Sequence, residues 1–261
     1  MSRLHRFAPV LGLVVAAVVV WLVARELRGF QIETVWATLR GLPPAHVAFA
    51  LGLTVVNYVV LTAYDVLGLR YVHHPLPYRR SALASFVGYA VSIALGHAVL
   101  TGGAVRYRLY GGWGVPREAI AKVVAFCGLA FWVGYLSLGG AVFLLHPPPT
   151  PTGLPVSTRT LGAVLLALFV VWLAVNAVRS RPLRIGRWTI DVPGWRMTVA
   201  QAAIASVDLA VAAAVLWVLL PGDVGFGPLL AAYLLATIAG VVSMVPGGLG
   251  VFDGILVAPL L

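Results

Sequence analysis

Charged side chains beside or within long apolar stretches are the residues of this sequence best suited to chemistry. Arg106 and Arg108 follow an apolar segment in the stretch TGGAVRYRLY, residues 101–110. A guanidinium group presents a rigid fork of N–H donors that matches the oxygens of a phosphate group. Phosphate binding is therefore one interpretation of the pattern. The alternative is that both arginines mark the boundary between membrane and water.

Three aspartates could hold a cationic group. Asp208 lies about nine residues into the apolar run 199–220, roughly 13 Å deep at the rise of an α-helix. A carboxylate at that depth is costly, so it should face a cavity or a partner. We expect Asp208 to contact an amine or a coupling proton, or to form a structural pair with Arg106, Arg108 or a backbone donor.

The other two aspartates lie closer to the ends of their segments. Asp65, near the end of the run 45–67, could pair with Arg106 or Arg70 in a gate-like salt bridge or contact a substrate. Asp253 follows the second glycine-rich segment and could receive an amine from outside. Tyr110 could stack near headgroups or be an ordinary interfacial aromatic.

Two Gly-Gly segments predict breaks in the helices. Gly102-Gly103 and Pro246-Gly247-Gly248 both adjoin apolar runs. Proline removes a hydrogen-bond donor and glycine permits positive φ, so we expect both segments to be hinges. Backbone opened inside a bilayer is tolerated only where protein or a water-filled cavity surrounds it, and two such breaks are typical of a transport site.

Other chemistry finds little support in the sequence. The six histidines are scattered and Cys127 is the only cysteine, so no metal site is predicted and Cys127 is assigned to packing. Asn57 and His97 are interpreted as helix-packing hydrogen bonders. The sequence shows no phosphate loop, no dinucleotide fingerprint and no Ser–His–Asp spacing, so no cofactor is expected.

The composition is that of a membrane protein. Hydrophobic residues make up 61% of the chain and charged residues 10%, with a mean hydropathy of +0.98. This predicts an all-α, polytopic integral membrane protein formed by a single transmembrane domain, residues 1–261. The net charge of +10 comes from arginines in short loops, which indicates cytoplasmic loop bias and anionic lipid contact rather than nucleic-acid binding.

Apolar runs long enough to span the bilayer are predicted at 8–24, 45–67, 119–145, 158–178 and 199–220. Two shorter, glycine-broken runs, 82–105 and 228–250, are predicted to be re-entrant hairpins with arms of about 12 residues, roughly 18 Å each. The linker 179–198 holds five arginines and is assigned to the cytoplasm. The proline-rich loop 146–157 is then outside, and the N-terminus is inside.

An inverted repeat is also predicted. Ser92-Ile-Ala matches Thr237-Ile-Ala, and Gly102-Gly103 matches Gly247-Gly248, both at the same offset. Because the two hairpins should open from opposite sides, units at about 45–145 and 190–261 form an inverted repeat, a recurrent transporter plan. The second unit lacks a counterpart of the span 119–145, so we expect the native protein to continue beyond Leu261.

Several of these residues carry a family resemblance. Tyr64-Asp65, Gly102-Gly103 with Arg106–Tyr110, and PGGLGVF at residues 246–252 resemble the membrane domain of the lysyl-phosphatidylglycerol synthase/flippase (multiple peptide resistance factor) family, over about residues 8–258. Stand-alone relatives without the synthase domain share this region. In the family a glutamate is expected after the Gly-x-Phe element, where this chain has Asp253.

The resemblance implies movement of a lysylated lipid to the outer leaflet of the bacterial inner membrane, which protects against cationic antimicrobial peptides. The expected partners are a phospholipid headgroup, anionic or aminoacylated, the membrane, and a second copy in a homo-oligomer. Two alternatives stay open: the membrane half of a phosphatidylglycerol lysyltransferase, and a small-solute or polyprenyl-lipid transporter. Lysyltransferase activity would need a soluble domain that this chain does not contain, so the chain is not expected to be an enzyme by itself.

Overall fold

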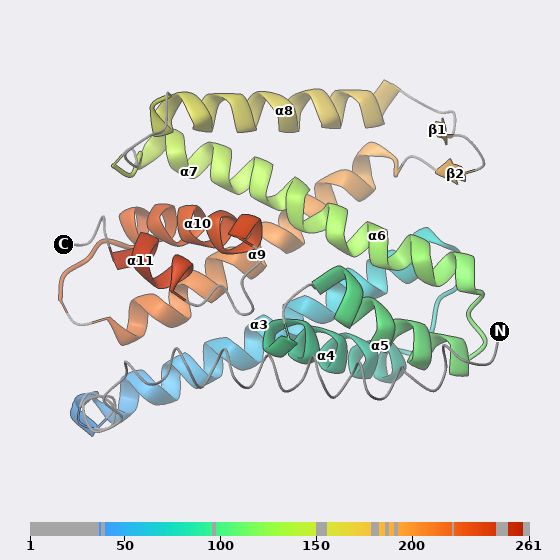
Figure 1. Cartoon of the computed structure of the whole chain (residues 1–261), viewed down its shortest axis with the longest axis horizontal. Helices are drawn as coiled ribbons and strands as arrows, with labels where there is room; N and C mark the ends of the chain where they lie inside the picture. Colours follow the sequence, from blue (N-terminus) through green and yellow to red (C-terminus); the bar gives the residue numbers. More distant parts are fainter. Residues whose placement is uncertain are drawn as a thin grey trace, which may run out of the picture.

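Long apolar helices form the framework of the computed structural model (Figure 1). The structure describes residues 37, 40–95, 98–149, 156–178, 183–185, 188–190, 193–220, 222–243 and 250–257. In this part of the chain, five helical stretches are long and apolar enough to cross a membrane: α3 (Pro44–Tyr71), the continuous helix Arg117–Leu145, α8 (Thr158–Val178), α9 (Trp195–Leu219) and α10 (Phe226–Ser243). The all-α membrane class is confirmed. The predicted span 8–24 lies outside the described residues.

The helix Arg117–Leu145 has three parts. These are α6 (Arg117–Gly134), the π-helical segment η1 (Tyr135–Gly139) and α7 (Gly140–Leu145). Pro116 immediately precedes α6, and Glu118 lies in its first turn, where an acidic side chain complements the helix dipole. In the basic linker the structure adds two short antiparallel strands, β1 (Leu183–Ile185) and β2 (Trp188–Ile190), which the sequence did not predict.

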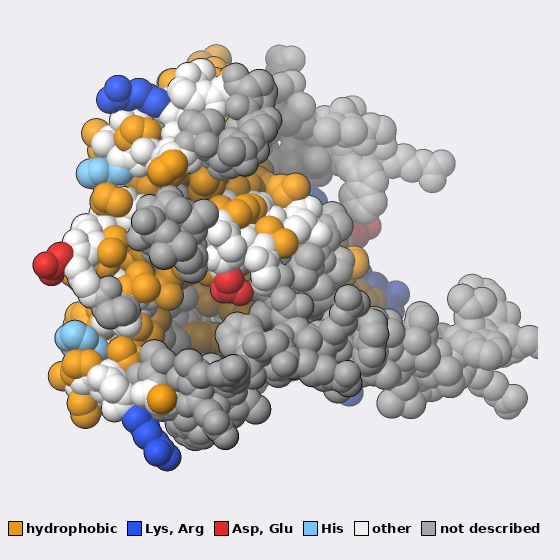
Figure 2. All heavy atoms as spheres, turned by 60° about the vertical axis from the view of Figure 1, so that its left-hand side comes forward, with side chains coloured by type: hydrophobic (Ala, Val, Ile, Leu, Met, Phe, Trp, Pro, Cys, Tyr) orange, Lys and Arg blue, Asp and Glu red, His pale blue; other side chains and the backbone are white. Residues whose placement is uncertain are grey.

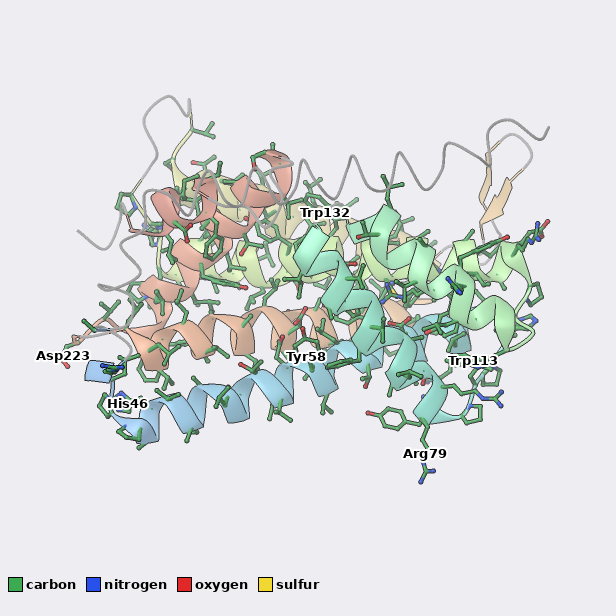
Figure 3. All side chains as sticks on the ribbon, turned by 60° about the horizontal axis from the view of Figure 1, so that its bottom comes forward. His46, Tyr58, Arg79, Trp113, Trp132 and Asp223 are labelled. Atoms are coloured by element: carbon green, nitrogen blue, oxygen red, sulfur yellow. The ribbon has the colours of Figure 1, made fainter. Side chains whose placement is uncertain are left out.

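Charged and polar residues mark the two ends of the long axis. Figure 3 shows His46 and Asp223 at one end and Arg79 and Trp113 at the other. Figure 2, which brings the left-hand end of Figure 1 forward, shows apolar side chains over much of the described surface in that view. Exposed apolar side chains include Phe49, Leu51 and Val55 on α3. In α8, only 11% of the most apolar 18-residue stretch is buried. These surfaces are suited to lipid.

Helices α4 (Tyr78–Leu95) and α5 (Ala98–Gly112) form an antiparallel pair. The guanidinium carbon of Arg80 lies 5.8 Å from the centre of the Trp113 ring, so the start of α4 is close to the end of α5. Both termini of the pair lie at the same end of the molecule in Figures 1 and 3, and the opposite tip lies near the middle of the long axis. The arms have 18 and 15 residues, longer than the predicted 12.

The predicted break at Gly102-Gly103 is wrong. Helix α5 continues through both glycines, and the connection to α4 falls at residues 96–97. Gly102 instead permits close packing, because a Cβ there would lie 3.1 Å from the carbonyl oxygen of Gly88 and would collide with Ser92 Oγ. Pro246, Gly247 and Gly248 lie outside the described residues, between α10 and α11 (Val251–Val257).

Candidate functional site

Polar residues interrupt the apolar helix α3 on two adjoining faces. Asn57 and Tyr64 are seven residues apart, so they lie on the same face, which contacts α9. Asp65 follows Tyr64 and therefore points about 100° away around the helix, toward α5. One helix thus presents polar groups to two neighbours at once.

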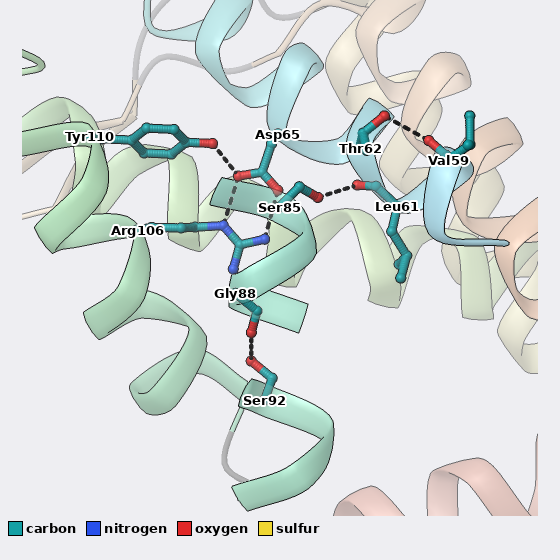
Figure 4. A network of polar contacts seen from close by, with 9 residues as sticks. All are labelled: Val59, Leu61, Thr62, Asp65, Ser85, Gly88, Ser92, Arg106 and Tyr110. Atoms are coloured by element: carbon teal, nitrogen blue, oxygen red, sulfur yellow. Dashed lines mark hydrogen bonds and ion pairs between the residues drawn. The ribbon is translucent and has the colours of Figure 1, made fainter. Parts of the chain in front are cut away.

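Asp65 forms a buried ion pair with Arg106 (Figure 4). Arg106 Nε donates to Asp65 Oδ1 and Nη2 donates to Oδ2, both at 2.7 Å. Tyr110, one turn further along α5, donates its hydroxyl to Oδ1 at 2.6 Å. Asp65 and Tyr110 are fully buried, and Arg106 is 4% exposed. This confirms the predicted salt bridge, in the two-pronged geometry that guanidinium offers to carboxylates and phosphates alike.

Helix α4 packs against the other side of the Arg106 side chain. The guanidinium carbon lies 4.7 Å from the centre of the Tyr89 ring, a cation–π distance. A Cβ at Gly88 would lie 3.2 Å from Arg106 Nη1, so glycine leaves room for the guanidinium. Ser92 donates to the Gly88 carbonyl at 2.7 Å, and Ser85 donates to the Leu61 carbonyl at 3.0 Å (Figure 4). The cation–π contact holds α4 against Arg106, and the Ser85 hydrogen bond holds α4 against α3.

Asp208 lies near the midpoint of α9 and is held by α3. Asn57 Nδ2 donates to Asp208 Oδ1 at 2.8 Å and to the Asp208 backbone carbonyl at 3.0 Å. The Tyr64 hydroxyl donates to Oδ2 at 3.0 Å. Unlike Asp65, Asp208 is partly exposed, and no cationic side chain among the described residues forms a salt bridge with it. The alternative of a pair with Arg106 or Arg108 is therefore wrong.

The two carboxylate clusters adjoin each other. The rings of Tyr64 and Tyr89 lie 6.0 Å apart, and each ring belongs to one cluster. The buried core around them includes Leu61, Tyr110 and Cys127. Asp65, Arg106, Tyr110 and Asp208 thus form one polar region within the apolar part of the molecule.

The remaining predicted residues lie elsewhere. Arg108 is exposed and lies on a different face of α5 from Arg106, so the two arginines do not form one fork. Asp253 is exposed in the first turn of α11, where its Oδ2 accepts a hydrogen bond from the Gly250 N–H at 3.3 Å. His97 lies outside the described residues.

Sequence reasoning missed two features of the site. Tyr89 was not singled out, because one more tyrosine in an apolar run gives no signal. The attachment of Asn57 and Tyr64 to Asp208 was also missed, although their seven-residue spacing on α3 could have indicated a shared polar face.

A surface hollow lies where α3 ends and α4 begins. Its volume is about 260 Å³, and its lining combines apolar side chains with one arginine and one tyrosine: Val66, Leu69, Arg70, Pro75, Leu76 and Tyr78. Tyr78 Oη is 3.1 Å from Thr62 Oγ1 on α3, which ties the hollow to the helix that carries Asp65. Among the described residues no group of three His, Cys, Asp or Glu side chains could hold a metal ion.

Comparison with known proteins gives consistent matches over nearly the whole chain. The family model described as "Lysylphosphatidylglycerol synthase TM region" matches residues 10–261. The "Uncharacterized protein slr0712" of Synechocystis sp. is 35% identical over 261 aligned residues, covering 98% of this chain and 81% of that protein. The "Inner membrane protein YbhN" of Escherichia coli is 33% identical over 233 residues, covering 87% of this chain and 73% of that protein.

Proposed function

This chain belongs to the lysylphosphatidylglycerol synthase TM region family, and from that premise we propose that it moves a phospholipid from the inner to the outer leaflet. It is a multi-pass protein of the inner membrane, the location that its Escherichia coli relative's name states. The observation that carries the proposal is the buried, two-pronged Asp65–Arg106 pair beside the partly exposed Asp208.

The ion pair suggests how a lipid headgroup is bound. Arg106 directs two parallel N–H groups at Asp65, and a phosphate group can occupy the same fork. If a phosphate takes this place, Asp65 loses its cationic partner while still buried, which is costly unless another cation arrives. A headgroup that brings its own ammonium group satisfies Asp65 in the same step.

Charge balance favours a lysylated headgroup. Asp65, Asp208 and Arg106 supply two negative charges and one positive charge. Lysyl-phosphatidylglycerol has one negative phosphate and two ammonium groups, so site and headgroup together are neutral. Plain phosphatidylglycerol would leave both carboxylates without a cation, at a cost that rises inside the membrane. We therefore infer aminoacylated phosphatidylglycerol as the preferred cargo.

The arrangement of helices supports a route across the membrane. The linkers at the Arg79 end are rich in arginine, so we assign this end to the cytoplasm. The α4–α5 pair would then be a re-entrant hairpin entered from the cytoplasm, and α10–α11 its counterpart in an inverted repeat. In this scheme exposed Arg108 attracts headgroups at the cytoplasmic side, and Asp253 receives the ammonium group on the other side.

The test is leaflet translocation in proteoliposomes, using labelled lysyl-phosphatidylglycerol beside phosphatidylglycerol. Arg106→Lys keeps the charge but loses the fork, so we expect lysyl-lipid movement to fall at least tenfold. Arg79→Lys is the matched control, since Arg79 is exposed at the start of α4. If folded wild type moves neither lipid, the proposal is refuted and the family's synthase name favours a lipid-presenting role.

A further inference from the structure

Asp208 differs from Asp65 in what balances its charge. The carboxylate of Asp65 lies 2.7 Å from the guanidinium group of Arg106, and the positive charge of Arg106 balances its negative charge. In the described part of the chain, the donors to the Asp208 carboxylate are both neutral: Asn57 and Tyr64. A carboxylate near the midpoint of a 25-residue membrane helix, about 37 Å long, is costly, and this cost favours the binding of a cation.

The groups that the structure describes around Asp208 are neutral. From α3 it faces Asn57 and Tyr64, and the phenol groups of Tyr89 on α4 and Tyr233 on α10 lie within electrostatic reach. The other elements packed on α9, namely α6, η1 and α8, bring no charged group to it among the described residues. The described residues therefore supply no positive charge to Asp208, and we assign that charge to a ligand.

The hydrogen bonds around Asp208 suit a proton better than a metal cation. Asn57 Nδ2 contacts two acceptors, so the amide must present its NH₂ group here rather than its oxygen. A sodium ion needs several oxygen ligands, whereas both carboxylate oxygens of Asp208 already face donors. Protonated Asp208 can instead donate its new O–H to Tyr64 Oη, because a phenol both donates and accepts.

We propose that Asp208 is a proton-binding site that exchanges one proton for the ammonium group of the cargo. When the ammonium group leaves on the outer side, Asp208 takes a proton from external water; it releases that proton to the cytoplasm before the next headgroup binds. Both states leave Asn57 and Tyr64 paired. One headgroup of net charge +1 moves out for each proton moving in, so the exchange is electroneutral. This inference rests on the proposed function.

The experiment uses proteoliposomes of the full chain with labelled lysyl-phosphatidylglycerol and a trapped pH dye, with the membrane potential held at zero. Because the exchange is reversible, protein orientation does not set its direction. A gradient of one pH unit should enrich the lipid about tenfold in the leaflet on the acidic side, since a tenfold ratio corresponds to about 1.4 kcal/mol. The dye should report matching proton entry.

Variants separate the proton site from folding. Asp208→Asn should lose both the gradient response and the proton uptake, while Asp208→Glu should keep them. An infrared band of a protonated carboxyl that titrates in wild type and is absent from Asp208→Asn would locate the proton directly. Tyr64→Phe, which removes the acceptor of that proton, should shift the pH at which the band appears.

Three results overturn the inference in distinguishable ways. Wild-type translocation that ignores the pH gradient and takes up no protons refutes the exchange and leaves the proposed function intact. A response to sodium in place of protons refutes the choice of cation. Absence of any lipid movement in folded wild type refutes the proposed function, and the exchange with it.

Discussion

Removing Arg106 should destabilise the protein far more than removing an arginine at its surface. In Arg106→Ala, Asp65 keeps only the hydrogen bond from Tyr110 and stays fully buried. Breaking a buried ion pair by deleting one partner costs about 3–5 kcal/mol, because the remaining charge is uncompensated. Loss of the cation–π contact with Tyr89 adds to this in the same direction.

The pair can also be removed without leaving a charge behind. Asp65→Leu combined with Arg106→Met replaces both partners by apolar side chains of similar length. Such replacements range from neutral to stabilising by about 1–4 kcal/mol relative to the ion pair. We therefore expect the double variant to be more stable than Arg106→Ala alone, even though it changes two buried positions. It should nevertheless fail to translocate lysylated lipid, since the phosphate fork is gone.

The assay is reversible unfolding in mixed micelles, with stability taken from the denaturant midpoint and the unfolding slope. Arg79→Ala is the control, because Arg79 is exposed on α4 and its loss should cost less than about 0.5 kcal/mol. The reasoning is refuted if Arg106→Ala and Arg79→Ala unfold at the same midpoint. It is equally refuted if the double variant loses as much stability as Asp65→Leu and Arg106→Met, each made singly, lose when added together.

Two further predictions concern packing and sidedness. Gly102→Ala should destabilise by about 1–3 kcal/mol through overpacking against α4. Gly103→Ala, whose Cβ meets only Val124 at 3.4 Å and beyond, should be neutral or stabilising by up to about 1 kcal/mol; equal midpoints in chemical unfolding would argue against close packing at Gly102. Cysteines introduced as Arg79→Cys and Asp223→Cys should react with an impermeant maleimide from opposite sides of the membrane, and labelling from one side would contradict the assigned topology.

The helices were the most predictable part of the fold. The run 158–178 coincides with α8, and 119–145 begins two residues after the first residue of α6. Bilayer thickness fixes the length of a spanning helix and excludes charge from it, so hydropathy alone locates such elements. The short strands β1 and β2 lie in the basic linker, where no bilayer constraint applies and three-residue strands give too weak a pattern to detect.

The site was only partly predictable. Arg106 was one of two partners considered for Asp65, beside Arg70 and a contact with substrate, and the fold selects Arg106. The packing role of Gly102 was not predictable, since a glycine can either adopt a positive φ or allow two helices to pack closely. The residues that Gly102 packs against, Gly88 and Ser92, belong to another helix. Asp208 was recognised, but its donor Asn57 lies 151 positions earlier and only the fold brings them together.

The π-helical segment η1 changes which face of one long helix is turned toward the neighbouring helices. Before it, α6 contacts α3, α5 and α9, whereas after it α7 contacts α8 and α10. A π-turn accommodates roughly one extra residue, and each residue of an α-helix turns the chain by about 100°. A relative that lost one residue within Tyr135–Gly139 would keep an unbroken span but rotate half of it away from its neighbours. We therefore expect this stretch to accept substitutions far more readily than single-residue deletions.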